Sequence, residues 1–171
     1  ENANSILIKV LEDETQEPMV RHEAAEALGA IGSESNMEIL QKYKNDPVVE
    51  VAETCELALD RIKWLQNPTN KADSDNNPYN SVDPAPPCPT KTPNELKTIL
   101  LDEKATLFDR YRAMFALRNM RSKEAVLALS FGLTCGSALF RHEVAFVLGQ
   151  LQDEASVPYL KQSLENTGEN E

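Results

Sequence analysis

The stretch that decides the fold occurs twice, as RHEAAEALG at residues 21–29 and as RHEVAFVLG at residues 141–149. Weaker copies of the same apolar pattern lie at residues 51–62 and 110–120. A repeat of about 30 residues that holds two helices is typical of α-solenoids of the HEAT type. We therefore predict an all-α fold, a HEAT-repeat α-solenoid in which neighbouring helical hairpins stack.

Residue composition agrees with helices, because Ala, Leu and Glu recur while aromatic residues make up only 6% and Gly contributes 6 residues. Five residues of the first copy recur with helical spacing and are predicted to share one buried face: Val20, Ala24, Ala27, Leu28 and Ile31. Gly29 and Gly149 follow at matching positions, so we predict that both let a neighbouring helix approach closely.

Three local signals predict helix starts. Asp46 precedes Pro47, the arrangement of an N-cap followed by proline in the first turn. Thr92 is followed by Pro93 and, three residues on, by Glu95, which is a capping-box pattern. Ser122 offers a further N-cap.

Between the helical segments the apolar periodicity stops. Residues 67–78 are polar, and residues 81–87 are rich in proline and favour an extended backbone. We predict two helical halves, residues 1–66 and 92–171, joined by a linker over residues 67–91, of which residues 79–87 are expected to dock on one half. The segment at 7–12 resembles the segment at 160–165. From that offset we expect the repeat array to be cut at both ends, so that the chain is a central fragment.

The net charge of −11 argues against a nucleic-acid partner, because phosphate binding needs clustered Lys and Arg. An acidic surface favours a basic partner, or it serves solubility alone. The three cysteines form no CxxC pair, which favours a reducing, cytoplasmic location, and Cys55 and Cys135 are predicted to be small core residues. No apolar run approaches the roughly 20 residues that a membrane-spanning helix needs, so no membrane partner is expected.

Both histidines of the chain stand in Arg-His-Glu. Imidazole and carboxylate together suit non-haem iron, although a histidine that merely satisfies a helix surface is the alternative. Adjacent helix positions diverge by about 100°, so His22 and Glu23 are not expected to chelate one ion together. They can serve two different centres, or one can bind a metal and the other a substrate. A second His four residues on is absent, which excludes a zincin motif.

The other repeats carry different residues at the positions of the His-Glu pairs, namely Glu53-Thr54 and Tyr111-Arg112. The repeat itself therefore does not require the pair, and this favours a functional role where the pair occurs. Arg21 and Arg141 precede the pairs, and we predict that they form ion pairs that cap the repeats.

Four stretches resemble deoxyhypusine hydroxylase, namely residues 17–31, 81–87, 110–119 and 136–143. The resemblance extends over nearly the whole chain apart from residues 67–78. It implies two symmetric HEAT-repeat halves that enclose a di-iron centre. It also implies oxygen-dependent hydroxylation of the deoxyhypusine side chain on a basic loop of a translation factor precursor, which forms hypusine.

The resemblance further implies roles for single residues. His22 would bind one iron, with Glu143 reaching it from the other half, and His142 would bind the second. Glu23 would hold the cationic amine of the substrate. The intact enzyme would hold two Fe(2+) ions, and because the outer His-Glu pairs of the family lie outside this sequence, we expect the chain alone to be inactive. The alternative function is that of a non-enzymatic HEAT-repeat interaction module. Open solenoid ends would also allow the chain to self-associate.

Overall fold

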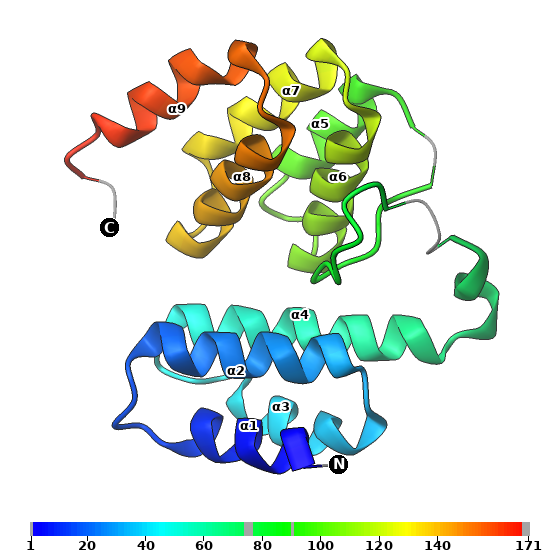
Figure 1. Ribbon diagram of the computed structural model, residues 1–171, viewed down its shortest axis with the longest axis vertical. Coiled ribbons are helices and arrows are strands. Elements are labelled where there is room, and N and C mark those ends of the chain that lie inside the picture. Colours follow the sequence, from blue (N-terminus) through cyan, green and yellow to red (C-terminus); the bar gives the residue numbers. More distant parts are fainter. Residues whose placement is uncertain (1, 74–76, 90, 169–171) are drawn as a thin grey trace. The chain divides into compact units, whose positions relative to one another are not determined.

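The computed structural model describes residues 2–73, 77–89 and 91–168, and these residues form helices and turns without a strand (Figure 1). The predicted all-α fold is confirmed. The α-helices are α1 (Asn2–Glu12), α2 (Pro18–Ile31), α3 (Met37–Tyr43), α4 (Val49–Gln66), α5 (Pro93–Leu101), α6 (Leu107–Met120), α7 (Lys123–Ser130), α8 (Ala138–Leu151) and α9 (Val157–Leu164). Short 3-10 helices are η1 (Glu34–Asn36), η2 (Pro68–Asp73), η3 (Phe131–Thr134) and η4 (Glu154–Ser156).

The chain folds into two compact units. Unit 1 comprises Glu1–Asp75 and Tyr79–Pro86, and unit 2 comprises Asn76–Pro78 and Pro87–Glu171. The chain therefore passes into unit 2, returns to unit 1 and then enters unit 2 again. Among the helices that the structure describes, none combines the length and the apolar character that crossing a bilayer needs.

In unit 1, α1 packs on α2, α3 packs on α4, and α2 lies against α4, which gives two layers (Figure 1). The core between them is apolar and contains Leu11, Ala24, Ala25, Leu28, Leu40, Val51, Cys55, Ala58, Leu59 and Ile62. The predicted buried face of α2 is only partly right, since Val20 and Ile31 are exposed. Because α2 is covered by α1 and also by α4, its buried residues include Ala25, which lies outside the predicted face.

Close approach of α2 to α4 depends on Gly29. A Cβ atom added there would lie 2.7 Å from Cβ of Ala58, closer than real Cβ atoms come. The predicted packing role of Gly29 is thus confirmed. The same prediction is wrong for Gly149, which is exposed and has nothing within 4 Å of an added Cβ.

Unit 2 is built around α6, which packs against α5, α7 and α8. Its core is aromatic at one point: Tyr111 meets Phe115 and Phe140 edge-on, with ring centroids 6.2 and 5.7 Å apart. Edge-to-face pairs of this kind stabilise a core beyond their buried area. α6 is thereby fixed in the centre of its unit.

Two of the three predicted helix starts are confirmed. Thr92 and Glu95 form a reciprocal capping box, and the Ser122 hydroxyl accepts a hydrogen bond from the amide of Ala125. The third is wrong, because α4 begins at Val49 and its N-cap is Val48. The carboxylate of Asp46 instead accepts the amide N–H of Val48 at 2.9 Å, which stabilises the turn before the helix.

The segment predicted as a linker begins with η2 and then divides between the units. Tyr79–Pro86 lies in unit 1, where the Arg61 guanidinium donates to the carbonyls of Asp83 at 3.1 Å and Gly29 at 2.8 Å. Ala85 is fully buried there. Part of the predicted linker, residues 74–76 and 90, lies outside the described residues.

Candidate functional site

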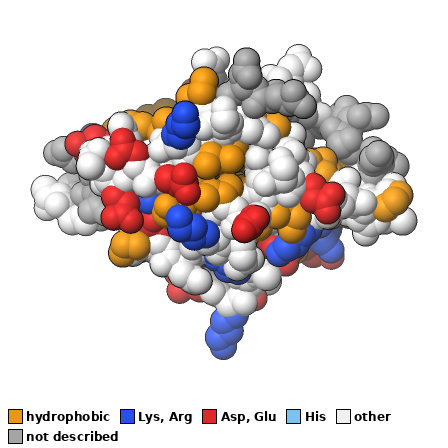
Figure 2. Space-filling view, turned by 90° about the horizontal axis from the view of Figure 1, so that it is seen from below, with side chains coloured by type: hydrophobic (Ala, Val, Ile, Leu, Met, Phe, Trp, Pro, Cys, Tyr) orange, Lys and Arg blue, Asp and Glu red, His pale blue; other side chains and the backbone are white. Residues whose placement is uncertain are grey.

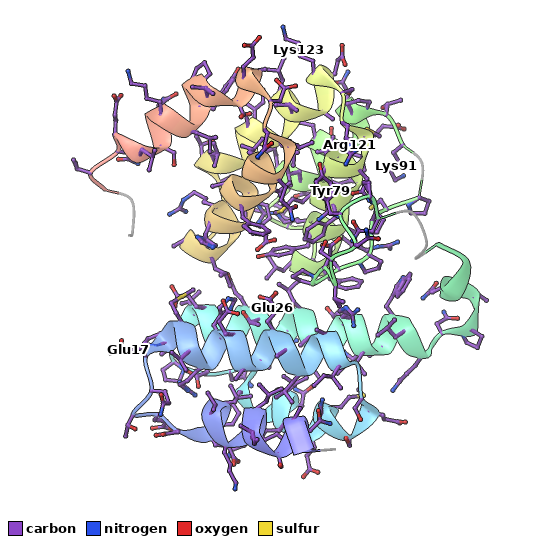
Figure 3. The ribbon with its side chains drawn as sticks, in the orientation of Figure 1. Glu17, Glu26, Tyr79, Lys91, Arg121 and Lys123 are labelled. Atoms are coloured by element: carbon purple, nitrogen blue, oxygen red, sulfur yellow. The ribbon has the colours of Figure 1, made fainter. Side chains whose placement is uncertain are left out.

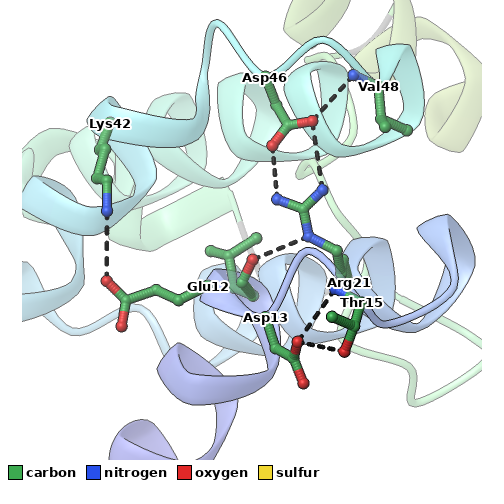
Figure 4. A network of polar contacts seen from close by, with 8 residues as sticks. Glu12, Asp13, Thr15, Arg21, Lys42, Asp46 and Val48 are labelled. Carbon is green, nitrogen blue, oxygen red and sulfur yellow. Dashed lines mark hydrogen bonds and ion pairs between the residues drawn. The ribbon is translucent and has the colours of Figure 1, made fainter.

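Arg21 joins three parts of unit 1 around the start of α2 (Figure 4). Its Nε donates to the carbonyl of Leu11 at 3.0 Å, and its Nη2 donates to Oδ2 of Asp46 at 2.6 Å. The ion-pair role predicted for Arg21 is confirmed, and both side chains are only 4% exposed. Hydrogen bonding to Asp46 raises the pKa of Arg21, so the guanidinium stays charged. The network fixes the backbone beside His22.

Unit 2 contains a copy of this arrangement at Arg110. Its Nε donates to the carbonyl of Leu100 at 2.9 Å, and its Nη2 lies 3.4 Å from Sγ of Cys135. Cys135 thus takes the place that Asp46 has in unit 1. Arg141, by contrast, donates to the carbonyl of Gly136 at 2.6 Å.

His22 lies in the second turn of α2, and its side chain is only 8% exposed. Its Nδ1 lies 2.6 Å from Oγ1 of Thr54 on α4. The Thr54 hydroxyl in turn donates to the carbonyl of Glu50 at 2.7 Å. Thr54 of α4 therefore holds the imidazole through Nδ1, and Nε2 lies at the opposite edge of the ring.

Two carboxylates lie near Nε2 of His22. Oε2 of Glu26 is 3.7 Å away and Oε1 of Glu23 is 3.9 Å away. The Glu23 side chain is 74% exposed and that of Glu26 only 37%. Burial, followed by the charges of Glu23 and Asp83, raises the pKa of Glu26. This end of the imidazole faces negative charge.

Glu26 is a site residue that the sequence reasoning missed. It stands four residues after His22, the spacing that brings side chains together on one helix face. The spacing is visible in the sequence, where Glu26 stands at the position that a second histidine has in a zincin motif. Figure 3 labels Glu26 on α2.

The second predicted pair lies on α8 in unit 2. His142 is exposed, and Glu143 is half-buried. Each unit thus carries one His-Glu pair, on α2 in unit 1 and on α8 in unit 2.

The donors present fit iron in kind, since imidazole nitrogen and carboxylate oxygen are the ligands of non-haem iron sites. Across residues 2–73, 77–89 and 91–168, no three His, Cys, Asp or Glu side chains are grouped closely enough to hold a metal ion. The thiol of Cys55 is not placed to act as a metal ligand. It is fully buried in the core, as predicted, and burial raises its pKa to about 12. Cys135, predicted as a core residue too, is only half-buried.

The charged side chains are mixed rather than segregated on the face drawn in Figure 2, where Asp and Glu alternate with Lys and Arg around exposed apolar side chains. The net charge of −11 is therefore not gathered into one acidic patch on this face.

Comparison with known proteins confirms the predicted HEAT-type repeat and shows that the chain is similar to deoxyhypusine hydroxylases. The PBS lyase HEAT-like repeat matches residues 20–46, 109–135 and 140–166. Deoxyhypusine hydroxylase of Drosophila pseudoobscura pseudoobscura is 64% identical over 170 residues, which is 99% of this chain and 56% of the relative. Deoxyhypusine hydroxylase of Danio rerio is 60% identical over 172 residues, again 99% of this chain and 56% of the relative.

A solved structure of human deoxyhypusine hydroxylase in complex with glycerol superimposes with a TM-score of 0.92 at 57% identity, and the match covers 99% of this chain and 58% of that one. The resemblance inferred from the four sequence stretches is confirmed. The chain spans about half the length of the curated relatives that it matches.

Proposed function

Because the chain is closely similar to deoxyhypusine hydroxylases over nearly all of its residues, we propose that it is part of such an enzyme. The reaction is hydroxylation of the deoxyhypusine side chain of a translation factor, which yields hypusine. The observation that carries the proposal is the identity of 64% over 170 residues, a stretch that includes both His-Glu pairs. Relatives that are named as enzymes favour this reading over a non-enzymatic interaction module.

Iron would supply the activation of molecular oxygen. We assign His22 and Glu143 to one iron and His142 to the other. The buried position of His22 supports this role, since a ligand held by packing keeps its orientation.

Glu23 is proposed to hold the cationic amine of the substrate. Its side chain is 74% exposed and therefore accessible to a ligand from outside the unit. Glu26 adds a second negative charge beside it, which raises the local attraction for an amine. The net charge of −11 favours encounter with a basic loop of the substrate protein.

The activity is tested in a chimera in which this chain replaces its matching segment of the Danio rerio relative. We expect the chimera to add one oxygen atom to a deoxyhypusine-containing substrate, as read by mass spectrometry. His22→Ala and His142→Ala are expected to abolish this, whereas the exposed-site control Glu34→Gln retains it. A folded, iron-loaded chimera that leaves the substrate unchanged would overturn the proposal.

The chain by itself is proposed to bind iron weakly and to be inactive, because it spans only about half the length of the relatives that it matches. Iron analysis and an absorption spectrum of the purified chain test this. A stoichiometric, coloured di-iron species would contradict it. Size-exclusion chromatography of the same sample tests self-association.

A cytoplasmic location belongs to the same proposal. Cys55, Cys88 and Cys135 are all free thiols, which agrees with a reducing compartment.

A further inference from the structure

The hydroxyl of Thr54 lies between two groups that fix the direction of its hydrogen bonds. It belongs to a buried side chain on α4 and donates to the carbonyl of Glu50, four residues earlier, at 2.7 Å. Helical threonines commonly make this bond to the preceding turn. Since a hydroxyl has one hydrogen, the oxygen of Thr54 then offers only lone pairs to His22 Nδ1, which is 2.6 Å away.

From this geometry we propose that Thr54 is a positioning residue that holds the proton of His22 on Nδ1 and so reserves the lone pair of Nε2 for a metal ion. A neutral imidazole carries its proton on one nitrogen only. With Nδ1 donating to Thr54, Nε2 is the acceptor nitrogen, and it faces the side on which Glu23 and Glu26 lie. The metal role rests on the proposed function, whereas the position of the proton does not.

The hydrogen bond also fixes the plane of the ring. Thr54 comes from a different helix, 32 residues along the chain, and α2 and α4 are packed tightly enough that a Cβ at Gly29 would collide with Ala58. Rotation of the imidazole about χ2 would break the contact with Thr54. Metal-bound histidines usually have such a partner on their other nitrogen, and its loss typically lowers metal affinity by about 10–100-fold.

Unit 2 provides an internal contrast. The residues at the positions of His22 and Thr54 are Tyr111 and Glu143, so the pair of imidazole and hydroxyl is not a requirement of the repeat. His142, the other histidine, is exposed on α8. The two imidazoles of the chain are therefore expected to differ, with His22 held in one tautomer and His142 exchanging between both.

Long-range proton–nitrogen NMR of the labelled chain, at a pH where the rings are neutral, reads the tautomer of each imidazole directly. The chain has only 2 histidines, and substitution of His142 by Gln assigns them. We expect His22 to carry its proton on Nδ1 in the native chain. A proton found predominantly on Nε2 would overturn the proposal.

The variants separate positioning from folding. Thr54→Val keeps the shape and removes the hydroxyl, and it should release His22 into a mixture of tautomers, whereas Thr54→Ser should restore the Nδ1 proton. Thr98→Val is the matched control, because Thr98 donates in the same way to the carbonyl of Asn94 but lies on α5 in unit 2. A Thr54→Val chain with an unchanged His22 tautomer would refute the role, and circular dichroism verifies that each variant is folded.

Titration with ferrous ion under argon, in the chimera described above, tests the consequence. Thr54→Val is expected to weaken binding by about 10–100-fold and Thr54→Ser by much less. An altered tautomer with unchanged ferrous affinity would contradict the metal role alone. A chimera that binds iron tightly yet hydroxylates nothing would contradict the proposed function and leave the tautomer result standing.

Discussion

At the scale of single residues, Gly29 and Gly149 occupy matching positions in the repeat but have different surroundings. Gly29 lies against Ala58 on α4, and Gly149 has open space where a Cβ would be. The sequence could not distinguish them, because a repeat position records what is shared between copies and not what packs against each copy.

Substitution by alanine should therefore act in opposite directions at the two glycines. Gly29→Ala is expected to destabilise the chain by about 1–3 kcal/mol, because the added methyl group overpacks the contact with α4. Gly149→Ala is expected to stabilise it by about 0.5–1 kcal/mol, because alanine loses less backbone entropy in a helix. Urea unfolding of both variants measures the two free energies, and equal effects would contradict the packing described here.

Glu26 gives a pH-dependent prediction. Burial first, then Glu23 and Asp83, raises its pKa in the folded chain, so its ionised form weakens the fold as pH rises through that value. Glu26→Gln should stabilise the chain near neutral pH by less than about 1 kcal/mol, since a side chain more than a third exposed is screened by solvent. The gain should vanish below the unfolded-state pKa of about 4.3. Urea unfolding at both pH values measures it, and a loss of stability at neutral pH would be the contrary result.

At the scale of elements, a buried arginine ties each pair of hairpins together. In unit 1, Arg21 joins the end of α1 to the turn before α4, and in unit 2 Arg110 joins the end of α5 to the turn before α8. The acceptors differ, because Asp46 is a charged carboxylate and Cys135 a thiol. A thiol is a weak hydrogen-bond acceptor, so the two ties differ in strength.

Removing each acceptor tests that difference. Asp46→Ala leaves a buried guanidinium without its counter-charge and is expected to cost about 3–5 kcal/mol. Cys135→Ala removes only a weak acceptor and is expected to cost about 1 kcal/mol or less. Thermal unfolding followed by circular dichroism compares them, and a larger loss for Cys135→Ala would contradict the ranking.

At the scale of the whole molecule, eight residues of the connection between the two units, Tyr79–Pro86, belong to unit 1. Arg61 holds it by donating to the carbonyl of Asp83 while also binding the end of α2. Burial lowers the pKa of Arg61 from its high ordinary value, although the side chain remains charged at neutral pH. Tyr79–Pro86, which composition marks as part of the linker, thus packs as an element of unit 1.

Arg61→Met should free this segment while keeping much of the apolar stem of the side chain. Thermolysin, which cleaves beside Val82, is expected to cut the variant about tenfold faster, because local opening controls proteolysis. Lys63→Met on the same helix is the matched control, since Lys63 is exposed and pairs with Asp60 three residues before it. Mass spectrometry of the fragments locates the cut, and equal rates for the two variants would refute the role of Arg61.

The sequence by itself determined what depends on neighbours along the chain. The repeat of about 30 residues predicted the HEAT solenoid, and the caps at Thr92 and Ser122 were readable because a cap bonds within three residues. The recurring His-Glu pairs and four short stretches were sufficient to indicate the family.

The tertiary structure decided what depends on contacts between helices. Asp46 proved to be the partner of Arg21 across 25 residues instead of a helix cap, Thr54 meets His22 across 32 residues, and Tyr79–Pro86 packs as part of unit 1. The physical reason is that helical periodicity specifies which side of a helix is apolar. The partner of a buried polar atom depends instead on which helix packs against it and on where along that helix the contact falls.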